Sequence, residues 1–444
     1  MVRSLILLAM VELALSVPTA SGADWPMYRG DAQRSARTAQ PLSVPLALVW
    51  KHQAADAPRP AWPRNTRMQF DRVFQVVAAG DRILFGSSAD GTVTALEADS
   101  GRVSWRFCTD APVRFAPALW QDRAFVASDD GWLYALQLSD GTLLWKVRGG
   151  PDARSVLGNE AMISRWPARG GPVVCDDVVY FAAGIWPSEG IFIYALDAAT
   201  GGVRWQNVDS GAIYMPQPHP TAEARSGVAA QGYLAVAGDR LFVPTGRAVP
   251  ACFDRHTGAF QYFHLQQYGQ NGEALAMVVN DVFFNGGLAF DVAQGTAIGK
   301  LGPGQLAAST AGVVRTAGTT VAEYVWREEE KPDRKGEPET VRTLVATWSR
   351  DGVPAAHALA TAGAQVILGG TDRIVLVDSA AQDVVWEAPV EGTACGLAVC
   401  GGQLLASTDR GAIYCFVSAA AAAPSSPAGS ATLAAADQSG ASPA

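Results

Sequence analysis

An eighteen-residue pattern occurs three times in the first half of the chain, and it constrains the fold more than any other feature. The copies begin at Ser88, Ser128 and Ser188, and each contains Ala-Leu, a turn that ends in Gly, and a Trp four residues after that Gly. The repeated positions are Gly101 and Trp105, Gly141 and Trp145, and Gly201 and Trp205. Fainter copies keep Gly258 and Trp386. Repetition at this period predicts a solenoid or a propeller.

The second copy predicts a unit of four antiparallel strands. Residues 123–128 and 132–138 are rich in strand-forming side chains and are separated by a turn. Residues 142–148 supply a third strand, and residues 114–120 supply a shorter first strand. The repeated Gly lies in the last hairpin, where it adopts a positive φ without steric cost. The repeated Trp lies on the outermost strand, where we expect its indole to pack against the next unit and donate its N–H there.

The number of units gives the number of blades. Six units are recognisable, at residues 81–107, 122–147, 176–207, 239–265, 281–301 and 364–389, and a degenerate one lies between 309 and 350. The last unit, residues 401–417, lacks its outer strand, whereas residues 46–53, with Trp50, have the pattern of such a strand. We expect this N-terminal strand to close the ring and remove its exposed edges. The sequence therefore predicts an all-β, eight-bladed β-propeller of four-stranded antiparallel blades, with seven blades as the alternative.

The two ends of the chain differ in composition from the repeats. Residues 1–23 contain Arg3, an apolar run interrupted by Glu12, and small residues before Asp24, which is typical of a cleaved signal peptide. This run is shorter than the roughly 20 apolar residues of a membrane span. Residues 418–444 are rich in Ala, Ser and Pro and bury too little apolar surface to fold. We predict a signal peptide (1–23), a propeller (24–417), a disordered tail (418–444), and an exported protein that is periplasmic or extracellular.

Composition excludes several kinds of site. The formal net charge is -8, with 34 basic and 42 acidic residues, which disfavours nucleic-acid binding. The six cysteines lack the spacing of zinc or haem motifs, so we predict no metal site and expect most cysteines to be buried thiols. Pairing of Cys395 with Cys400 or Cys415 stays open. The chain has no GxSxG or HExxH motif, so we assign no catalytic residue.

The long connections between units fall on one end of the predicted ring, at residues 51–72, 149–171, 184–190 and 209–227. Long loops on a rigid scaffold commonly carry binding sites. The candidate ligand-binding residues are Arg114, Arg154, Arg165, Trp166, Arg169, Trp186, Glu189, Arg225 and Arg247, and the first connection adds Arg64, Arg67 and Arg72. Arginine binds carboxylates or phosphates through a planar fork, which predicts a small anionic or aromatic ligand, or an envelope protein. Alternatively, these arginines pair with nearby carboxylates and only fix the loops.

The repeat ALDAATGGVRW, residues 195–205, resembles the tryptophan-docking repeat of quinoprotein propellers. That family includes pyrroloquinoline quinone (PQQ) dehydrogenases and the outer-membrane assembly propeller lipoprotein. The opening DWPMYRGDAQRSART, residues 24–38, is similar to exported quinoprotein-like proteins of planctomycete-type bacteria. The dehydrogenase members imply PQQ, a calcium or lanthanide ion held by Glu and Asn, a catalytic Asp and an adjacent cysteine pair. This chain lacks the cysteine pair. Because fold does not set function, two functions follow: a non-catalytic binding scaffold of the envelope or, alternatively, a PQQ-dependent alcohol or sugar dehydrogenase.

Overall fold

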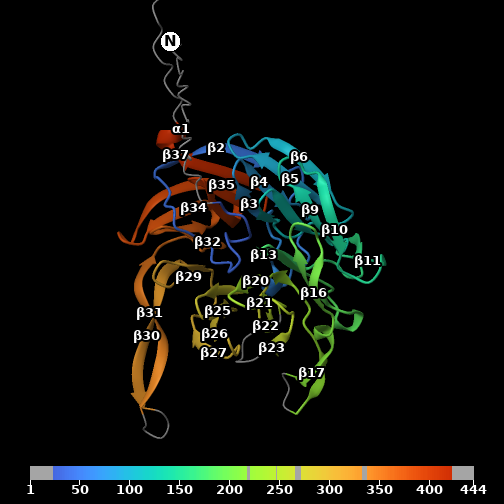
Figure 1. Cartoon of the computed structure of the whole chain (residues 1–444). Helices are drawn as coiled ribbons and strands as arrows, with labels where there is room; N and C mark the ends of the chain where they lie inside the picture. The colour runs from blue at the N-terminus through green and yellow to red at the C-terminus, as the bar shows by residue number, and fades with distance from the viewer. Residues whose placement is uncertain (1–23, 218–220, 247, 266–271, 333–337, 423–444) are drawn as a thin grey trace, which may run out of the picture.

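The structure is a computed structural model that describes residues 24–217, 221–246, 248–265, 272–332 and 338–422. Within these residues almost all regular structure is β strand, and the strands form short antiparallel sheets around a common centre (Figure 1). The predicted signal peptide, residues 423–444 of the predicted tail and the candidate Arg247 lie outside the described residues. Among the described residues, no helix combines the length and apolar character needed to cross a membrane.

Six sheets contain four strands that are consecutive within a unit and pair in chain order. The first three are β3 (Val76–Ala79), β4 (Arg82–Gly86), β5 (Thr92–Glu97) and β6 (Val103–Cys108); β7 (Ala118–Trp120), β8 (Arg123–Ala127), β9 (Trp132–Gln137) and β10 (Leu143–Arg148); and β13 (Gly170–Cys175), β14 (Val178–Ala183), β15 (Phe192–Asp197) and β16 (Val203–Asn207). The third sheet gains a parallel strand, β19 (Gly232–Tyr233), beside β13.

The next three sheets follow the same plan. They are β20 (Ala235–Ala237), β21 (Arg240–Val243), β22 (Val249–Asp254) and β23 (Phe260–His264); β24 (Met277–Val279), β25 (Val282–Asn285), β26 (Leu288–Asp291) and β27 (Ala297–Lys300); and β28 (Leu306–Ala308), β29 (Val313–Ala317), β30 (Thr320–Pro332) and β31 (Pro338–Asp351). Strands β30 and β31 form a long hairpin that extends away from the other sheets (Figure 1). The degenerate unit predicted between residues 309 and 350 therefore corresponds to the sixth sheet.

An eight-stranded sheet joins the two ends of the chain. Its order is β1 (Arg37–Thr38), β32 (Ala358–Ala362), β33 (Gln365–Gly369), β34 (Thr371–Asp378), β35 (Asp383–Cys400), β36 (Gln403–Thr408), β37 (Ala412–Ser418) and β2 (Leu46–Gln53). The first half of β35 pairs with β34 and its second half pairs with β36, so the sheet contains two four-stranded units. The predicted count of eight blades depends on counting this sheet as two. Closure by the N-terminal strand is confirmed, because β2 pairs antiparallel with β37.

The end of the described chain differs from the predicted tail boundary. Ser418 pairs with Leu46 as the last residue of β37, and Ala419–Ala422 form the short helix α1. The amide of Ala419 donates to the carbonyl of Pro45 at 2.8 Å. The propeller therefore includes the first residues of the Ala-rich segment, because the edge of β2 offers them backbone partners.

Each repeated Trp packs against the unit that follows it. The hydrogen bonds from indole Nε1 to a carbonyl of that unit are Trp50 to Ala98 at 3.1 Å, Trp105 to Leu138 at 3.0 Å, Trp145 to Ala199 at 3.2 Å, Trp205 to Arg255 at 2.8 Å and Trp386 to Leu46 at 2.9 Å. The first four rings also lie against the repeated glycines, in the pairs Trp50–Gly101, Trp105–Gly141, Trp145–Gly201 and Trp205–Gly258. The local repeat thus supplies contacts between neighbouring sheets.

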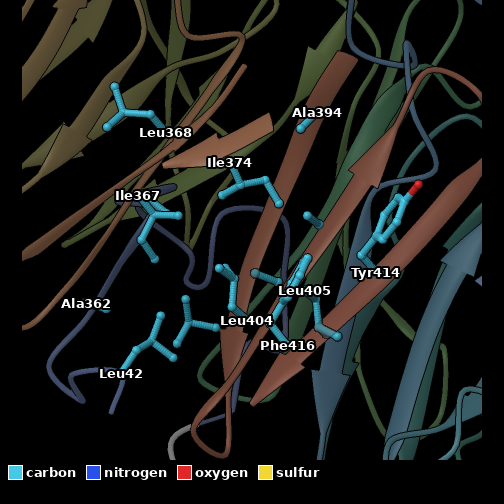
Figure 2. Packing of buried hydrophobic residues seen from close by; sticks show 14 of the residues in the cluster. Leu42, Ala362, Ile367, Leu368, Ile374, Ala394, Leu404, Leu405, Tyr414 and Phe416 are labelled. Carbon is cyan, nitrogen blue, oxygen red and sulfur yellow. The ribbon is translucent and has the colours of Figure 1, made fainter. Parts of the chain in front are cut away.

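The cores lie between neighbouring four-stranded units. Figure 2 shows one of them, in which Ile367 and Ile374 of β33 and β34 belong to the same buried cluster as Leu404, Leu405 and Phe416 of β36 and β37. Each such side chain contributes about 1.5–3 kcal/mol when fully buried. All six cysteines are free thiols; Cys252, Cys400 and Cys415 are buried, Cys175 and Cys395 are half-buried and Cys108 is exposed.

The long connections contain small elements of their own. These are the 3-10 helices η1 (Thr66–Met68), η2 (Pro187–Glu189) and η3 (Ser210–Ala212) and the hairpins β11 (Ser155–Gly158) with β12 (Ala161–Ser164) and β17 (Ile213–Pro216) with β18 (Glu223–Ser226). Each hairpin forms a separate two-stranded sheet. Within the described residues, the predicted insertions therefore form hairpins and turns attached to the ring.

The segment that precedes β2, residues 24–38, runs along the innermost strands of the ring, and we call it the N-terminal strap. Its backbone hydrogen bonds reach successive sheets in chain order: Trp25 with Ala78, Pro26 with Leu119, Ala32 with Val236, Gln33 with Val278, Ser35 with Ala308 and Ala36 with Thr361. These partners lie on β3, β7, β20, β24, β28 and β32, which are the first strands of their units. The strap therefore crosses the central channel and ties the inner strands together.

Candidate functional site

The central channel contains a cavity of about 240 Å³. Its walls come from residues at or just before the starts of the inner strands, and its lining also includes Tyr28 and Arg29 of the N-terminal strap. The strap contacts later positions of these strands, such as the last residue of β28, Ala308. The cavity is thus open toward the end of the ring that carries the long connections, and the strap forms its floor.

The floor of the cavity carries buried positive charge. Arg29 is 8% exposed, and its Nε donates to the carbonyl of Arg34 at 2.9 Å while Nη2 donates to the carbonyl of Leu306. Burial lowers the pKa of Arg29, and within the described residues no carboxylate lies at ion-pair distance from its guanidinium. The ring of Tyr28 stacks on that of Tyr233 at 3.7 Å between centroids. The strap therefore places a guanidinium and an aromatic ring at the bottom of the channel.

Arg34 holds the strap below this floor. It is 0% exposed, and its three nitrogens donate to the carbonyls of Leu234, Tyr28 and Pro172 at 2.8, 3.1 and 2.9 Å. Burial lowers the pKa of Arg34 to about 10. Because all its nitrogens bind backbone carbonyls, Arg34 is a structural residue.

The mouth of the cavity carries two further guanidinium groups. Arg67 and Arg72 both line it, and the structure gives neither side chain a hydrogen-bond or ion-pair partner within the described residues. His357 and Cys395 also line the cavity. Burial and then the charge of Arg72 lower the pKa of His357, and burial raises the pKa of Cys395 to about 11. Both groups are therefore neutral near pH 7, and the mouth is charged by the arginines.

The charges that line the cavity are unbalanced. Among the described residues of the lining, Arg29, Arg67 and Arg72 face one carboxylate, that of Glu273. The backbone amide and carbonyl of Glu273 bond to the side chain of Asn285 at 3.3 and 3.1 Å, which fixes this wall. On a chain whose net charge is -8, this arrangement makes the channel an electropositive site.

Two arginines singled out in the sequence lie in a buried ion-pair network. Nε of Arg114 binds Oδ2 of Asp129 at 2.6 Å and its Nη1 binds Oδ2 of Asp71 at 2.8 Å, while Nε of Arg169 binds Oδ1 of Asp129 at 2.5 Å. Arg114 is 4% and Arg169 0% exposed. Burial acts to raise the pKa of Asp129, but the two guanidinium groups hold it below its usual value; at Asp71 burial prevails and raises the pKa. For these two arginines, the ion pairs agree with the alternative interpretation of the sequence, in which the arginines pair with carboxylates and fix the loops.

Four other candidates form a second cluster. Arg165 forms an ion pair with Glu189, and Nε1 of Trp166 donates to the carbonyl of Glu189 at 2.6 Å. The guanidinium carbons of Arg154 and Arg165 lie 5.2 and 5.6 Å from the Trp166 ring centroid. Trp166 is 2% exposed, so its ring is covered by these neighbours.

The two remaining described candidates are exposed. Trp186 is 52% exposed, and Arg225 lies on β18 opposite Tyr214, which is 65% exposed. None of the eight candidates within the described residues lines the central cavity. Their role in binding stays a prediction.

Sequence reasoning missed most of the cavity. It placed Arg67 and Arg72 in the first long connection, but Arg29, Glu273, His357 and Cys395 were not selected. The available signal was the stretch YRGDAQRSAR, which concentrates three arginines before the strand that closes the ring, β2. Its passage through the ring could not be inferred, because it depends on contacts with six sheets far apart in sequence.

Comparisons with known proteins relate this geometry to two groups. A family model described as outer membrane protein assembly factor BamB matches residues 47–259. The quinohemoprotein alcohol dehydrogenase ADH IIB of Pseudomonas putida is 28% identical over 154 residues, which make up 32% of this chain and 21% of that enzyme. The chain therefore spans about a fifth of the length of this curated relative.

Among solved structures, a europium-containing methanol dehydrogenase superposes with a TM-score of 0.61 at 12% identity, covering 89% of this chain and 98% of that one. The chain has the fold of the dehydrogenase propellers. The quinohemoprotein alcohol dehydrogenase of Comamonas testosteroni gives 0.60 at 15% identity, covering 93% of this chain and 83% of that one. The resemblance to PQQ-repeat propellers is thus confirmed, and at these identities the structural likeness concerns the fold alone.

The resemblance implies PQQ with a metal ion, which the cavity residues fit only in part. Arginines suit the carboxylates of PQQ. A metal ion is a poor fit, because Glu273 is the one carboxylate that the described residues contribute to the lining. In the part of the chain that the structure describes, no three His, Cys, Asp or Glu side chains are grouped so that they could hold a metal ion. We therefore derive no reaction step through a metal-bound quinone.

Proposed function

We propose that the protein is an exported, non-catalytic propeller of the bacterial envelope that binds a small anionic ligand in its central channel. The observation that carries this proposal is the charge of the cavity, in which three arginines face one carboxylate. Export and the envelope location rest on the signal peptide predicted over residues 1–23.

The charge imbalance favours a ligand because like charges around one cavity attract an anion, and because one of them, Arg29, is buried. A guanidinium removed from water loses solvation that only a counter-charge or hydrogen bonds restore. Arg29 is buried and bonds to two carbonyls, whereas Arg67 is exposed and Arg72 is half-buried, and neither of these two is paired within the described residues. A carboxylate or phosphate would pair with these guanidinium groups in a bidentate manner. The cavity volume of about 240 Å³ limits the ligand to a small molecule.

A PQQ-dependent dehydrogenase remains the alternative function. PQQ is itself an aromatic tricarboxylate, so the same arginines suit it, and the fold is that of dehydrogenase propellers. The lining, with Glu273 as its one carboxylate, supports simple anion binding better than metal-assisted oxidation. Binding of PQQ without calcium would fit the proposal, whereas calcium-dependent dye reduction with an alcohol or sugar would support the enzyme.

The test is a titration of the purified mature protein with small carboxylates, inorganic phosphate and PQQ, with and without calcium. A ligand that binds the native state raises the unfolding temperature in proportion to occupancy, so no substrate need be known. We expect a saturable shift that the double variant Arg67→Gln, Arg72→Gln removes. Arg102→Gln is the matched control, because Arg102 forms an exposed ion pair with Glu97 outside the cavity. The absence of any shift at millimolar anion would reject the proposal.

A second candidate function is docking of an envelope protein at the β11–β12 hairpin. Leu157 and Met162 form a cross-strand pair there and are 78% and 57% exposed. Exposed apolar patches are typical of protein interfaces. Replacing both residues with Ser should abolish capture of one specific envelope protein, whereas Leu48→Ser, at a 52% exposed leucine of β2, should not. Equal capture by both variants would reject this candidate.

A further inference from the structure

The N-terminal strap is held in one conformation along most of the ring. Its backbone bonds to six inner strands measure 2.8–2.9 Å, as in Ala32 to Val236 (2.8 Å) and Gln33 to Val278 (2.9 Å). Arg29, Arg34 and Ala36 have φ values of 61°, 61° and 55°. A non-glycine residue rarely adopts this left-handed region, and such strain persists only where surrounding contacts impose it. The contacts of the strap therefore fix where the Arg29 side chain lies.

Arg29 and Arg34 differ in how many of their N–H donors remain free to bind a ligand. Arg34 uses Nε, Nη1 and Nη2 for backbone carbonyls and does not line the cavity. Arg29 lines the cavity, and its hydrogen bonds use only Nε and Nη2; within the described residues Nη1 has no hydrogen-bond partner. A guanidinium carries five N–H donors. Arg29 thus keeps donors for a group that reaches the floor.

We propose that the ligand of the central channel carries two anionic groups, one bound at the mouth by Arg67 and Arg72 and the other at the floor by Arg29. This inference rests on the proposed function and names the ligand class: a small dianion, such as a dicarboxylate or a phosphorylated acid. The three arginines come from two different segments, the strap and the first long connection. A ligand that spans both would also bind the strap to the ring.

The experiment compares a dicarboxylate with its monoester, which has nearly the same shape and one charge fewer. Dissociation constants are measured calorimetrically for the series malonate to glutarate and for the monomethyl esters, with 2-phosphoglycolate as the phosphate form. A charge-assisted hydrogen bond is worth about 1.5–3 kcal/mol, so the protein should prefer the best dianion by about tenfold or more. Arg29→Met should remove this preference and leave the affinity for the monoester unchanged.

The outcomes separate this inference from the proposed function. If no anion binds the unaltered protein, the proposed function fails. If monoester and dianion bind equally, or if Arg29→Met weakens both alike, only the two-anion inference is overturned. If Arg29→Met does not fold, Arg29→Lys replaces it. This variant keeps the positive charge but loses the planar guanidinium, so it should reduce the preference for the dianion over the monoester without abolishing it. Hydrogen exchange gives an independent readout: the dianion should slow exchange of the strap amides, for example at Gly30 and Ala36, and the monoester should not.

Discussion

The indole ring of Trp105 lies against Gly141 of the next sheet. A β-carbon at Gly141 would lie 2.5 Å from Cε3 of Trp105, and Nε1 of Trp105 donates to the carbonyl of Leu138 at 3.0 Å. Trp105 is on β6 and Gly141 is in the turn between β9 and β10. Trp105 and Gly141 hold two positions of the same repeated pattern in neighbouring units. The ring of Trp105 fills the space that the absent side chain of Gly141 leaves.

This contact predicts that Gly141→Ala destabilises the protein more than its backbone conformation alone would. Gly141 has a φ of 76°, which already costs Ala about 1–2 kcal/mol, and the clash with Trp105 adds an overpacking cost of about 1–3 kcal/mol. Gly80→Ala is the control, because Gly80 has a φ of 56° and nothing lies within 4 Å of its β-carbon position. Denaturant unfolding of both variants measures the difference. Equal losses would show that the ring contact contributes nothing.

The buried network predicts a large effect of Asp129→Asn. This change leaves Arg169 without a charged partner at 0% exposure, and a broken buried pair typically costs about 3–5 kcal/mol. Asp152→Asn, at the exposed pair with Arg154, should cost about 1 kcal/mol or less. Chemical denaturation compares the two variants.

The same network predicts how stability depends on pH. The pKa of Asp129 is lower in the folded state than its usual value of 3.8, so its contribution is present above that value and is lost as the pH falls below it. The stability difference between Asp129→Asn and the unaltered protein should therefore shrink at acidic pH. A difference that stays constant down to acid denaturation would contradict the assigned ion pair.

The channel predicts a weak dependence of anion binding on pH near neutrality. Burial and Arg72 hold the pKa of His357 below 6.5, and Asp409, which acts in the opposite direction, does not offset them. His357 is therefore neutral, and affinity should be unchanged as the pH falls from about 8 to about 7. Affinity should rise only at pH values below 6.5, where His357 gains its proton. A calorimetric titration across this range checks the prediction, and a steep rise centred near pH 7 would contradict it.

Cys395 provides a chemical probe of the cavity. Because its pKa is raised to about 11, only about one thiol in a thousand is ionised near pH 8, and the thiolate is the reactive form. Iodoacetamide at that pH should modify the exposed Cys108 much faster than Cys395, as peptide mass spectrometry would show. Modification of Cys395 should accelerate at about pH 10, and a bound anion should slow it. Comparable rates at pH 8 would contradict the raised pKa.

The sequence determined those features that depend on short spacing. The Gly-Trp pattern occurs in full in three units, so the strand pattern, the packing of each repeated Trp against the next unit, and the closing strand around Trp50 could be predicted. Each depends on residues a few positions apart, or on one strand that lacks a partner. The contact of Trp105 with Gly141 itself was not predicted. The sequence identified the arginines of the insertions as candidate binding residues by their type. It could not show that a carboxylate such as Asp129 already binds some of them.

Only the tertiary structure decided where the binding cavity lies. Arg29, Arg72, Glu273 and His357 are separated by up to hundreds of residues and share no local pattern. They meet because the ring closes and because the strap passes through it, held by inner-strand amides of six sheets. Ring closure turns the starts of many inner strands toward one axis, and the charge that accumulates there depends on which side chains remain unpaired. Which charged side chains form ion pairs is decided only in the folded molecule. Because the arginines of the channel are not matched by carboxylates there, the channel is electropositive on an acidic protein.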